Sequence, residues 1–165
     1  MGVPICIREF RLPDLAQVLA INAEGWPGVS RLDAAAVSDL SSTAPVMWVA
    51  ASGTQVAGYL IGLLPESDDD GEEFLWFKER RSAFLYVGQI AIAASSRGRG
   101  IGRQFYEKLA QWSAVHGCTR LVCEVNIVPP NPESLAFHGT CGFTEVGRLG
   151  VSDGREVVLL ERRIR

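Results

Sequence analysis

The sequence predicts one mixed α/β domain, and three observations lead to that fold class. The chain has 165 residues, which is enough for one substantial core but too few for a second catalytic domain. Short runs with the two-residue period of strands alternate with runs that have the spacing of helices. In the middle of the chain a strand, an amphipathic helix and another strand follow one another, as in a parallel strand pair. We therefore expect a single domain over residues 1–165.

Residues 1–64 are expected to form a strand, two helices and an antiparallel hairpin. The segments are, in order, Ile5–Glu9, Leu12–Gly25, Leu32–Leu40, Val46–Ala51 and Gln55–Leu64. Pro13 and Asp14 are typical of a first helical turn. The small polar residues 52–54 predict the turn of the hairpin.

Residues 66–80 look like an insertion with two contrasting parts. Glu66–Gly71 is too acidic to be buried, whereas Phe74–Phe77 is too aromatic to be left in water. The segment is interpreted either as a mobile acidic tip with an aromatic anchor or as a lid whose carboxylates attract a cationic amine.

The rest of the chain is expected to alternate between strands and helices. The segments are a strand Phe84–Ala93, a helix Arg103–His116, a strand Arg120–Asn126, a helix from Asn131 to Gly142, and strands Phe143–Arg148 and Glu156–Arg162. Asn131 followed by Pro132 is an N-cap and first-turn pair, and Gly142 is a typical helix end. Asp153 and Gly154 predict a turn between the last two strands.

Composition argues against several classes of protein. The net charge of −3 opposes a broad electrostatic grip on nucleic acid, and no apolar run approaches the ~20 residues that cross a bilayer. The start of the chain does not resemble a secretory signal, so a cytoplasmic location is expected. Cys6, Cys118, Cys123 and Cys141 form no CxxC pair. No disulfide framework is therefore expected. His116, Cys118 and Cys123 could be metal ligands, but their spacing favours buried reduced thiols, and no metal site is expected.

The most informative segment is the glycine- and arginine-rich run IAIAASSRGRGIGR at residues 90–103, between a predicted strand and a predicted helix. Glycines let the backbone approach an anion closely, and the amides at the start of the next helix point toward it. Arg97, Arg99 and Arg103 add charge-assisted donors. Such a loop is typical of pyrophosphate binding. A Walker loop would need Gly-Lys-Ser/Thr, which is absent, and a Rossmann loop would normally follow the first strand.

Arg97-Gly98-Arg99-Gly100-Ile101-Gly102 resembles the Gln/Arg-x-x-Gly-x-Gly/Ala signature of the GNAT superfamily of acyl-CoA N-acyltransferases. Ile90-x-Ile92 resembles the cofactor-facing strand of that family. A second block resembles its later strand, helix and Gly-Phe closure: Leu121–Val125, Asn131, Ser134, Phe137, His138, Gly142 and Phe143. The resemblance covers nearly the whole chain, although residues 1–64 match only in outline.

The resemblance implies a mixed, mostly antiparallel sheet of six to seven strands flanked by about four helices. Its strands at Ile90 and Arg120 would be parallel neighbours that splay apart and leave a slot for pantetheine. It also implies acetyl-CoA as the cofactor. The implied cofactor-binding residues are Ile90, Ala91, Ile92, Arg97, Gly98, Arg99, Gly100, Ile101, Gly102, Arg103, Asn131 and Ser134. Asn131 has a second interpretation as a plain helix N-cap, and both roles are compatible.

Acyl transfer to an amine needs a base for the amine and an acid near the departing thiolate. Many family members have a tyrosine seven positions after the asparagine, where this chain has His138. We expect His138 to be that acid or, alternatively, to have a structural or solvent-facing role. Glu124, in Cys123-Glu124-Val125, resembles the Leu-Glu-Val of ribosomal-protein alanine acetyltransferases and is the candidate base, with an ordinary salt bridge as the alternative.

Three further residues are candidates for binding the acceptor. Tyr86 and Gln89 lie on the strand that leads into the cofactor loop and are candidates for orienting either a water or the acceptor. Trp26, in the Gly25–Gly28 turn, either staples its loop to the core or forms a wall of the acceptor site.

The predicted function is acetyl transfer from acetyl-CoA to a primary amine of a small molecule or a peptide. The alternative is a non-catalytic acyl-CoA sensor or regulatory module on the same fold, and nucleotide binding by the glycine loop is a third class. No nucleic-acid or membrane partner is expected. A homodimer through edge strands is a further expectation.

Overall fold

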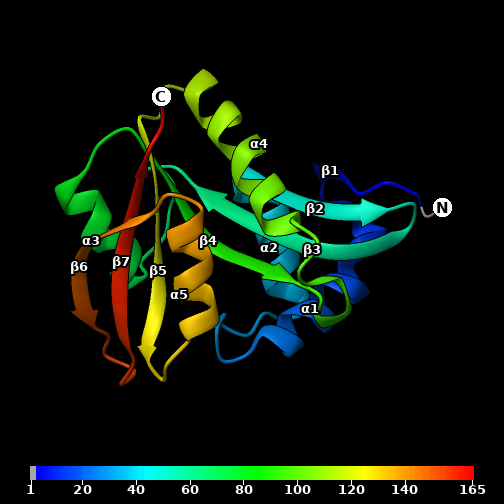
Figure 1. Ribbon diagram of the computed structural model, residues 1–165, viewed down its shortest axis with the longest axis horizontal. Helices are drawn as coiled ribbons and strands as arrows, with labels where there is room; N and C mark the ends of the chain where they lie inside the picture. The colour runs from blue at the N-terminus through cyan, green and yellow to red at the C-terminus, as the bar shows by residue number, and fades with distance from the viewer. Residues whose placement is uncertain (1–2) are drawn as a thin grey trace. The chain divides into compact units, whose positions relative to one another are not determined.

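Seven strands and five α-helices make up the computed structural model over the residues that it describes, 3–165 (Figure 1). The strands are β1 (Cys6–Glu9), β2 (Val46–Ser52), β3 (Gln55–Leu63), β4 (Phe84–Ile92), β5 (Arg120–Val128), β6 (Thr144–Gly150) and β7 (Glu156–Arg163). The helices are α1 (Leu15–Gly25), α2 (Ala34–Thr43), α3 (Glu72–Arg80), α4 (Ile101–Val115) and α5 (Pro132–Thr140), with short 3₁₀ turns at Leu12–Asp14 and Ala94–Ser96.

The strands are hydrogen-bonded in the order β1-β2-β3-β4-β5-β7-β6. The β4–β5 pair is parallel, over Phe84↔Arg120 to Tyr86↔Val122, while the β1–β2, β2–β3, β5–β7 and β6–β7 pairs are antiparallel. This confirms the expected mixed, mostly antiparallel sheet with one parallel pair. The parallel ladder is only three residue pairs long, although both strands have nine residues.

The chain divides into two compact units. Unit 1 consists of Met1–Leu63 and Gly88–Glu107, and unit 2 consists of Leu64–Val87 and Lys108–Arg165. The chain passes from one unit to the other after Leu63, within β4 and within α4. The expected single domain over residues 1–165 stays a prediction.

Unit 1 is built on β1, β2 and β3, with α1 and α2 packed beside them (Figure 1). Its core is formed by apolar side chains from both helices and the strands, among them Val18, Ile21, Val37, Val49, Tyr59 and Ile61. The helix expected at Leu32–Leu40 begins at Ala34. The reason is its N-cap, because the carboxylate of Asp33 accepts a hydrogen bond from the amide of Ala36 at 2.8 Å.

Unit 2 contains a helix, α3, within the segment that was interpreted as an insertion. Phe74 and Phe77 of this helix are fully buried, and the Phe74 ring meets Phe84 and Tyr86 edge-on at 6.1 and 5.5 Å. This agrees with the aromatic anchor. Acidic residues in the first turn and basic residues in the last turn suit the helix dipole, and this charge pattern is visible in the sequence.

The remaining elements follow the expected order with small shifts. Helix α4 begins at Ile101 rather than Arg103, so Gly102 is already helical. Asn131 is the N-cap of α5, and its side chain accepts from the amide of Ser134 at 3.3 Å. Gly142 follows α5 with φ = +90°, a conformation that favours glycine. The fifth α-helix, beyond the four expected, is α3.

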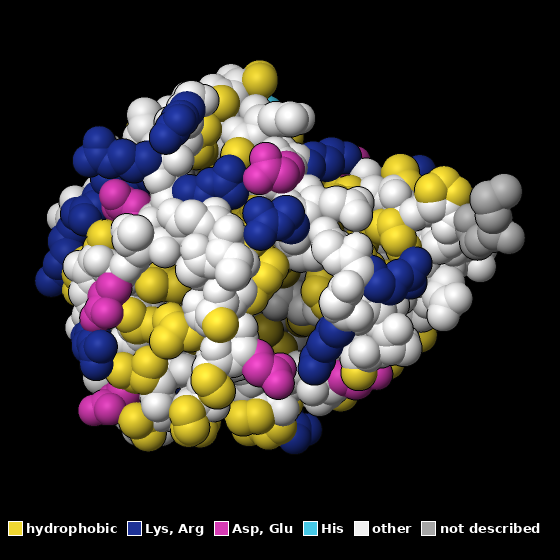
Figure 2. All heavy atoms as spheres, in the orientation of Figure 1, with side chains coloured by type: hydrophobic (Ala, Val, Ile, Leu, Met, Phe, Trp, Pro, Cys, Tyr) yellow, Lys and Arg dark blue, Asp and Glu magenta, His cyan; other side chains and the backbone are white. Residues whose placement is uncertain are grey.

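Basic side chains gather on one side of unit 2. Figure 2 shows them over α3 and the C-terminal end of β7, where Lys78, Arg80, Arg162 and Arg163 occur in the sequence.

Among residues 3–165, the helices lack the combination of length and apolar character that crossing a bilayer requires.

Candidate active site

The glycine loop leads from β4 into α4 in unit 1, as the sequence predicts. Gly98 and Gly100 have φ of +75° and +77°, where other residues are strained. Apart from the glycine itself and the two residues that flank it, no heavy atom of the described chain lies within 4 Å of where a Cβ would stand at either glycine. The loop therefore presents bare backbone to solvent, followed by the N-terminus of α4, and suits an anion.

Three arginines surround this loop. Arg97, Arg99 and Arg103 are all exposed, and the Nε of Arg97 donates to the carbonyl of Ile92 at 3.3 Å. That contact draws the Arg97 side chain back over the end of β4. The loop thus combines glycine amides with guanidinium groups, which is the donor set that a diphosphate accepts.

The end of β4 is held tightly against β3 within unit 1. A Cβ at Gly58 would stand 2.8 Å from Cδ1 of Ile92 and 2.9 Å from the carbonyl of Ala91, so only glycine permits this approach. The amide of Ala93 also donates to the carbonyl of Ala57 at 2.7 Å. Ile90, Ala91 and Ile92 therefore form a well-supported strand end next to the glycine loop.

Gln89 belongs to a network of neutral side chains in unit 1. The Tyr59 hydroxyl donates to Oε1 of Gln89 at 2.6 Å, and Nδ2 of the buried Asn22 donates to the Tyr59 oxygen at 3.0 Å and to Oε1 of Gln89 at 3.2 Å. Burial raises the pKa of Tyr59 to about 12, so this tyrosine stays protonated.

The same network fixes the loop between α1 and α2. Nδ2 of Asn22 and Nε2 of Gln89 both donate to the carbonyl of Ser30, at 2.8 and 2.9 Å. Oδ1 of Asn22 accepts from the amide of Leu32 at 2.9 Å. Gln89 thus reaches the loop that carries Trp26.

Trp26 is not stapled to the core. Its side chain is half exposed, and the guanidinium of Arg31 lies 4.8 Å from the centre of its ring. This arrangement is a surface cation–π pair. The core-staple interpretation is therefore wrong, and the acceptor-wall interpretation stays a prediction.

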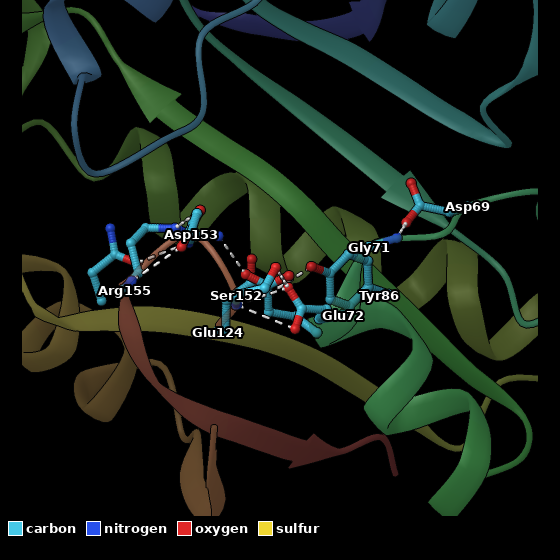
Figure 3. Close-up of polar contacts among 10 residues, drawn as sticks. Asp69, Gly71, Glu72, Tyr86, Glu124, Ser152, Asp153 and Arg155 are labelled. Atoms are coloured by element: carbon cyan, nitrogen blue, oxygen red, sulfur yellow. Dashed lines mark hydrogen bonds and ion pairs between the residues drawn. The ribbon is translucent and has the colours of Figure 1, made fainter. Parts of the chain in front are cut away.

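Tyr86 and Glu124 meet in unit 2, from β4 and β5 (Figure 3). The Tyr86 hydroxyl donates to Oε2 of Glu124 at 2.7 Å. Burial of the Glu124 carboxyl, and next the negative charge of Glu73, raise its pKa to about 8. Burial first, and then the negative charge of Glu124, raise the pKa of Tyr86 well above its usual value. Two of the predicted site residues are thus brought together.

Glu73 and Arg155 complete this charged cluster, and sequence reasoning missed both. Oε1 of Glu73, whose side chain is nearly buried, accepts from Arg155 at 2.8 Å. Arg155 also donates to Oδ1 of Asn126 at 3.1 Å and to Oδ2 of Asp153 at 2.8 Å. The usable signal was Glu73 itself, a carboxylate directly before the aromatic residues that anchor α3.

The turn between β6 and β7 is tied to the start of α3. The amide of Ser152 donates to Oε2 of Glu72 at 3.0 Å and its hydroxyl donates to the same oxygen at 2.6 Å (Figure 3). Asp69 is also engaged, because Oδ1 accepts from the amide of Gly71 at 2.8 Å. The acidic segment is therefore partly fixed by its own hydrogen bonds.

His138 lies on α5 and is buried between aromatic rings. It meets Phe137 and Phe143 edge-on at 5.1 and 5.3 Å. Its Nδ1 lies 2.7 Å from the carbonyl of Ser134, which can only accept, so the proton sits on Nδ1. Burial lowers the pKa of His138, so the ring is neutral at neutral pH. The acid role stays a prediction.

The model of the Acetyltransferase (GNAT) family matches residues 15–143. Among curated relatives, L-2,4-diaminobutyric acid acetyltransferase of Nocardia farcinica is 36% identical over 84 residues, which is 50% of this chain and 35% of that protein. The chain therefore spans about a third of the curated relatives that it matches.

Solved structures with the same fold cover nearly the whole chain. Ard1 of Thermoplasma volcanium has a TM-score of 0.79 at 18% identity and covers 98% of both chains. The yncA protein of Salmonella typhimurium, solved with its cofactor acetyl-CoA, has a TM-score of 0.73 at 16% identity and covers 98% of this chain and 95% of its own. At these identities the likeness concerns the fold.

Proposed function

The chain belongs to the acetyltransferase (GNAT) family, and on that premise we propose that it transfers an acetyl group from acetyl-CoA to a primary amine. The observation that carries the proposal is the Glu124 carboxyl, whose pKa of about 8 suits a general base near neutral pH. The glycine loop with its three arginines supports acetyl-CoA as the donor, because its donors fit the diphosphate of coenzyme A. Acetyl-CoA supplies the thioester carbonyl that the amine attacks.

Glu124 is proposed to take the proton from the acceptor amine, which arrives as an ammonium ion. The Tyr86 hydroxyl occupies Oε2 of Glu124 and so leaves Oε1 for the proton. Tyr86 is then a positioning residue, and it stays protonated because its own pKa is raised. A base of this kind contributes roughly 10²–10⁴-fold to the rate.

His138 is proposed as the acid for the departing thiolate, on the resemblance alone. Its neutral ring carries a proton only at Nδ1, which is bound to the Ser134 carbonyl, so this contribution is expected to be small near neutral pH. We expect His138→Gln to lower kcat less than tenfold, well below the effect of a lost base. A larger loss in a variant that folds normally would restore His138 to a central role.

The acceptor is proposed to be a small molecule or a peptide that presents a cationic amine. Asp69 and Glu73 supply negative charge in unit 2, and the Nocardia relative is named for an amine that is an amino acid. We also propose a cytoplasmic location, which the free thiols of Cys6, Cys118, Cys123 and Cys141 support.

The test is calorimetric titration with acetyl-CoA, with ATP and NAD as controls, followed by thiol release with a panel of amines. The panel contains L-2,4-diaminobutyrate, spermidine and a peptide with a free N-terminus. We expect selective binding of acetyl-CoA and turnover with at least one amine. Arg97→Ala with Arg99→Ala should weaken binding, whereas Glu124→Gln should bind normally and turn over slowly. Binding without turnover would favour the acyl-CoA sensor, and binding of ATP or NAD alone would overturn the proposal.

A further inference from the structure

An ion pair in unit 2 lies on the same side of β5 as the candidate base. Glu73 lies in the first turn of α3, Arg155 directly precedes β7, and their side chains are 2.8 Å apart. Arg155 also binds Asn126, two residues after Glu124 on β5. Residues two apart on a strand share a face, so Arg155 reaches the face that carries Glu124.

Further hydrogen bonds fix Arg155 itself and the residue next to Glu73. The guanidinium of Arg155 is bound by Asp153, which also accepts from the Arg155 amide at 3.0 Å. Glu72, next to Glu73, is bound by the amide and hydroxyl of Ser152. The charges of Glu73 and Arg155 therefore have fixed positions.

The groups around the Glu124 carboxyl come from β4, from β5 itself, from α3 and from the turn before β7. Tyr86 on β4 donates a hydrogen bond that favours the carboxylate, and Asn126 on β5 itself is neutral. Glu73 on α3 repels the carboxylate, and Arg155 before β7 attracts it. Asp69 acts on Tyr86, and the exposed Glu72 and Asp153 are occupied by Ser152 and Arg155. The two charges that oppose each other at Glu124 are thus the two members of the ion pair.

We propose that Glu73 and Arg155 are positioning residues that set the proton affinity of Glu124, with Glu73 favouring the acid and Arg155 favouring the carboxylate. The proposal rests on the proposed role of Glu124 as the base. It gives a function to an ion pair that touches no reacting atom in the mechanism above. The pair then adjusts the pH at which the amine can be deprotonated.

The experiment is a titration of the Glu124 carboxyl by ¹³C NMR in the full chain, with the signal assigned by its loss in Glu124→Gln. Glu73→Gln keeps the shape of the side chain and removes the negative charge, so the midpoint should move to lower pH, by about 1 pH unit. Arg155→Gln should move the midpoint the opposite way. The double variant should return toward the parent. The matched control is Glu79→Gln, because Glu79 lies on the same helix but is exposed and pairs with Arg80. This variant should leave the Glu124 midpoint unchanged.

Several outcomes would overturn the proposal. They are an unchanged midpoint in Glu73→Gln, or shifts in the same direction for both single variants. If Arg155→Gln does not fold, as judged by circular dichroism, the direction of the shift in Glu73→Gln decides alone. The titration needs no acceptor, so a failure of every amine to react would refute the proposed function without changing this result. In an active enzyme, the pH midpoint of kcat/KM should follow the NMR midpoint in each variant.

Discussion

Each of the two units contains a buried tyrosine that donates to a neighbouring side chain, and the two differ in whether the acceptor group can ionise. In unit 1, Tyr59 donates to the neutral amide of Gln89 at 2.6 Å. In unit 2, Tyr86 donates to the carboxyl of Glu124 at 2.7 Å. The geometry is nearly the same, and both tyrosines have raised pKa values and stay protonated.

The difference decides what each network does. The amide of Gln89 has no proton to gain or lose, so the Asn22–Tyr59–Gln89 network holds its loop equally well at any pH near neutral. Glu124 gains and loses a proton near pH 8, so the same kind of contact becomes responsive to pH. Hydrogen bonds of nearly the same geometry thus hold a loop in unit 1 and position the proposed base in unit 2.

The largest expected effect tests whether Glu124 makes the stability of the protein depend on pH. The pKa of Glu124 in the folded chain, about 8, lies above the ordinary value of 4.5. The contribution of Glu124 to stability is therefore complete below pH 4.5 and is lost as pH rises from 4.5 through 8. The loss is at most about 1.4 kcal/mol for each pH unit in that window. The free energy of unfolding of Glu124→Gln, measured by urea unfolding, should therefore rise relative to that of the parent as the pH is raised from acid to alkaline. An equal pH dependence in both proteins would contradict this account.

The next effect tests the neutral network. Asn22→Ala removes contacts to Ser30, Leu32, Tyr59 and Gln89 and should cost about 3 kcal/mol, because buried polar groups lose their partners. The cost should be the same at acid and alkaline pH. Tyr59→Phe, which removes one hydroxyl, should cost about 1 kcal/mol and is the milder companion. A cost that varies with pH would mean that the neutral network is coupled to a titrating group.

The smallest effect concerns His138, a titratable residue in unit 2 whose buried surroundings favour the neutral form of its ring. Burial lowers its pKa below 6.5 in the folded chain, so its contribution to stability is complete above pH 6.5 and is lost as pH falls below it. His138→Gln should show a weaker loss of stability on acidification than the parent, apart from a constant packing cost. Thermal unfolding of both proteins on each side of pH 6.5 measures the difference. An unchanged acid dependence would mean that the ring does not remain neutral.

Local patterns predicted most of the fold because caps, turns and periodicity are local. The N-cap Asn131, the helix end at Gly142 and the glycine loop are where short-range rules place them. Helix α3 was missed because its acidic start reads as a solvated segment, while the burial of Phe74 and Phe77 depends on strands that are remote in sequence.

The candidate site was predicted in part for the same reason. Tyr86 and Glu124 were named from their places on strands, but their contact depends on the parallel pairing of β4 with β5. The Glu73–Arg155 pair joins residues 82 positions apart and has no local signature. For Trp26 only the core-staple interpretation was wrong, because the side chain is half exposed and its ring lies beside Arg31.

The central claim is that Glu124 is the base for transfer of an acetyl group to an amine. It is tested most directly by the pH dependence of kcat/KM for thiol release from acetyl-CoA, in the parent and in Glu124→Gln. We expect the parent rate to rise about tenfold per pH unit and level off near pH 8, and the variant to be roughly 10²–10⁴-fold slower without that inflection. A variant that keeps both the rate and the inflection of the parent would contradict the assignment.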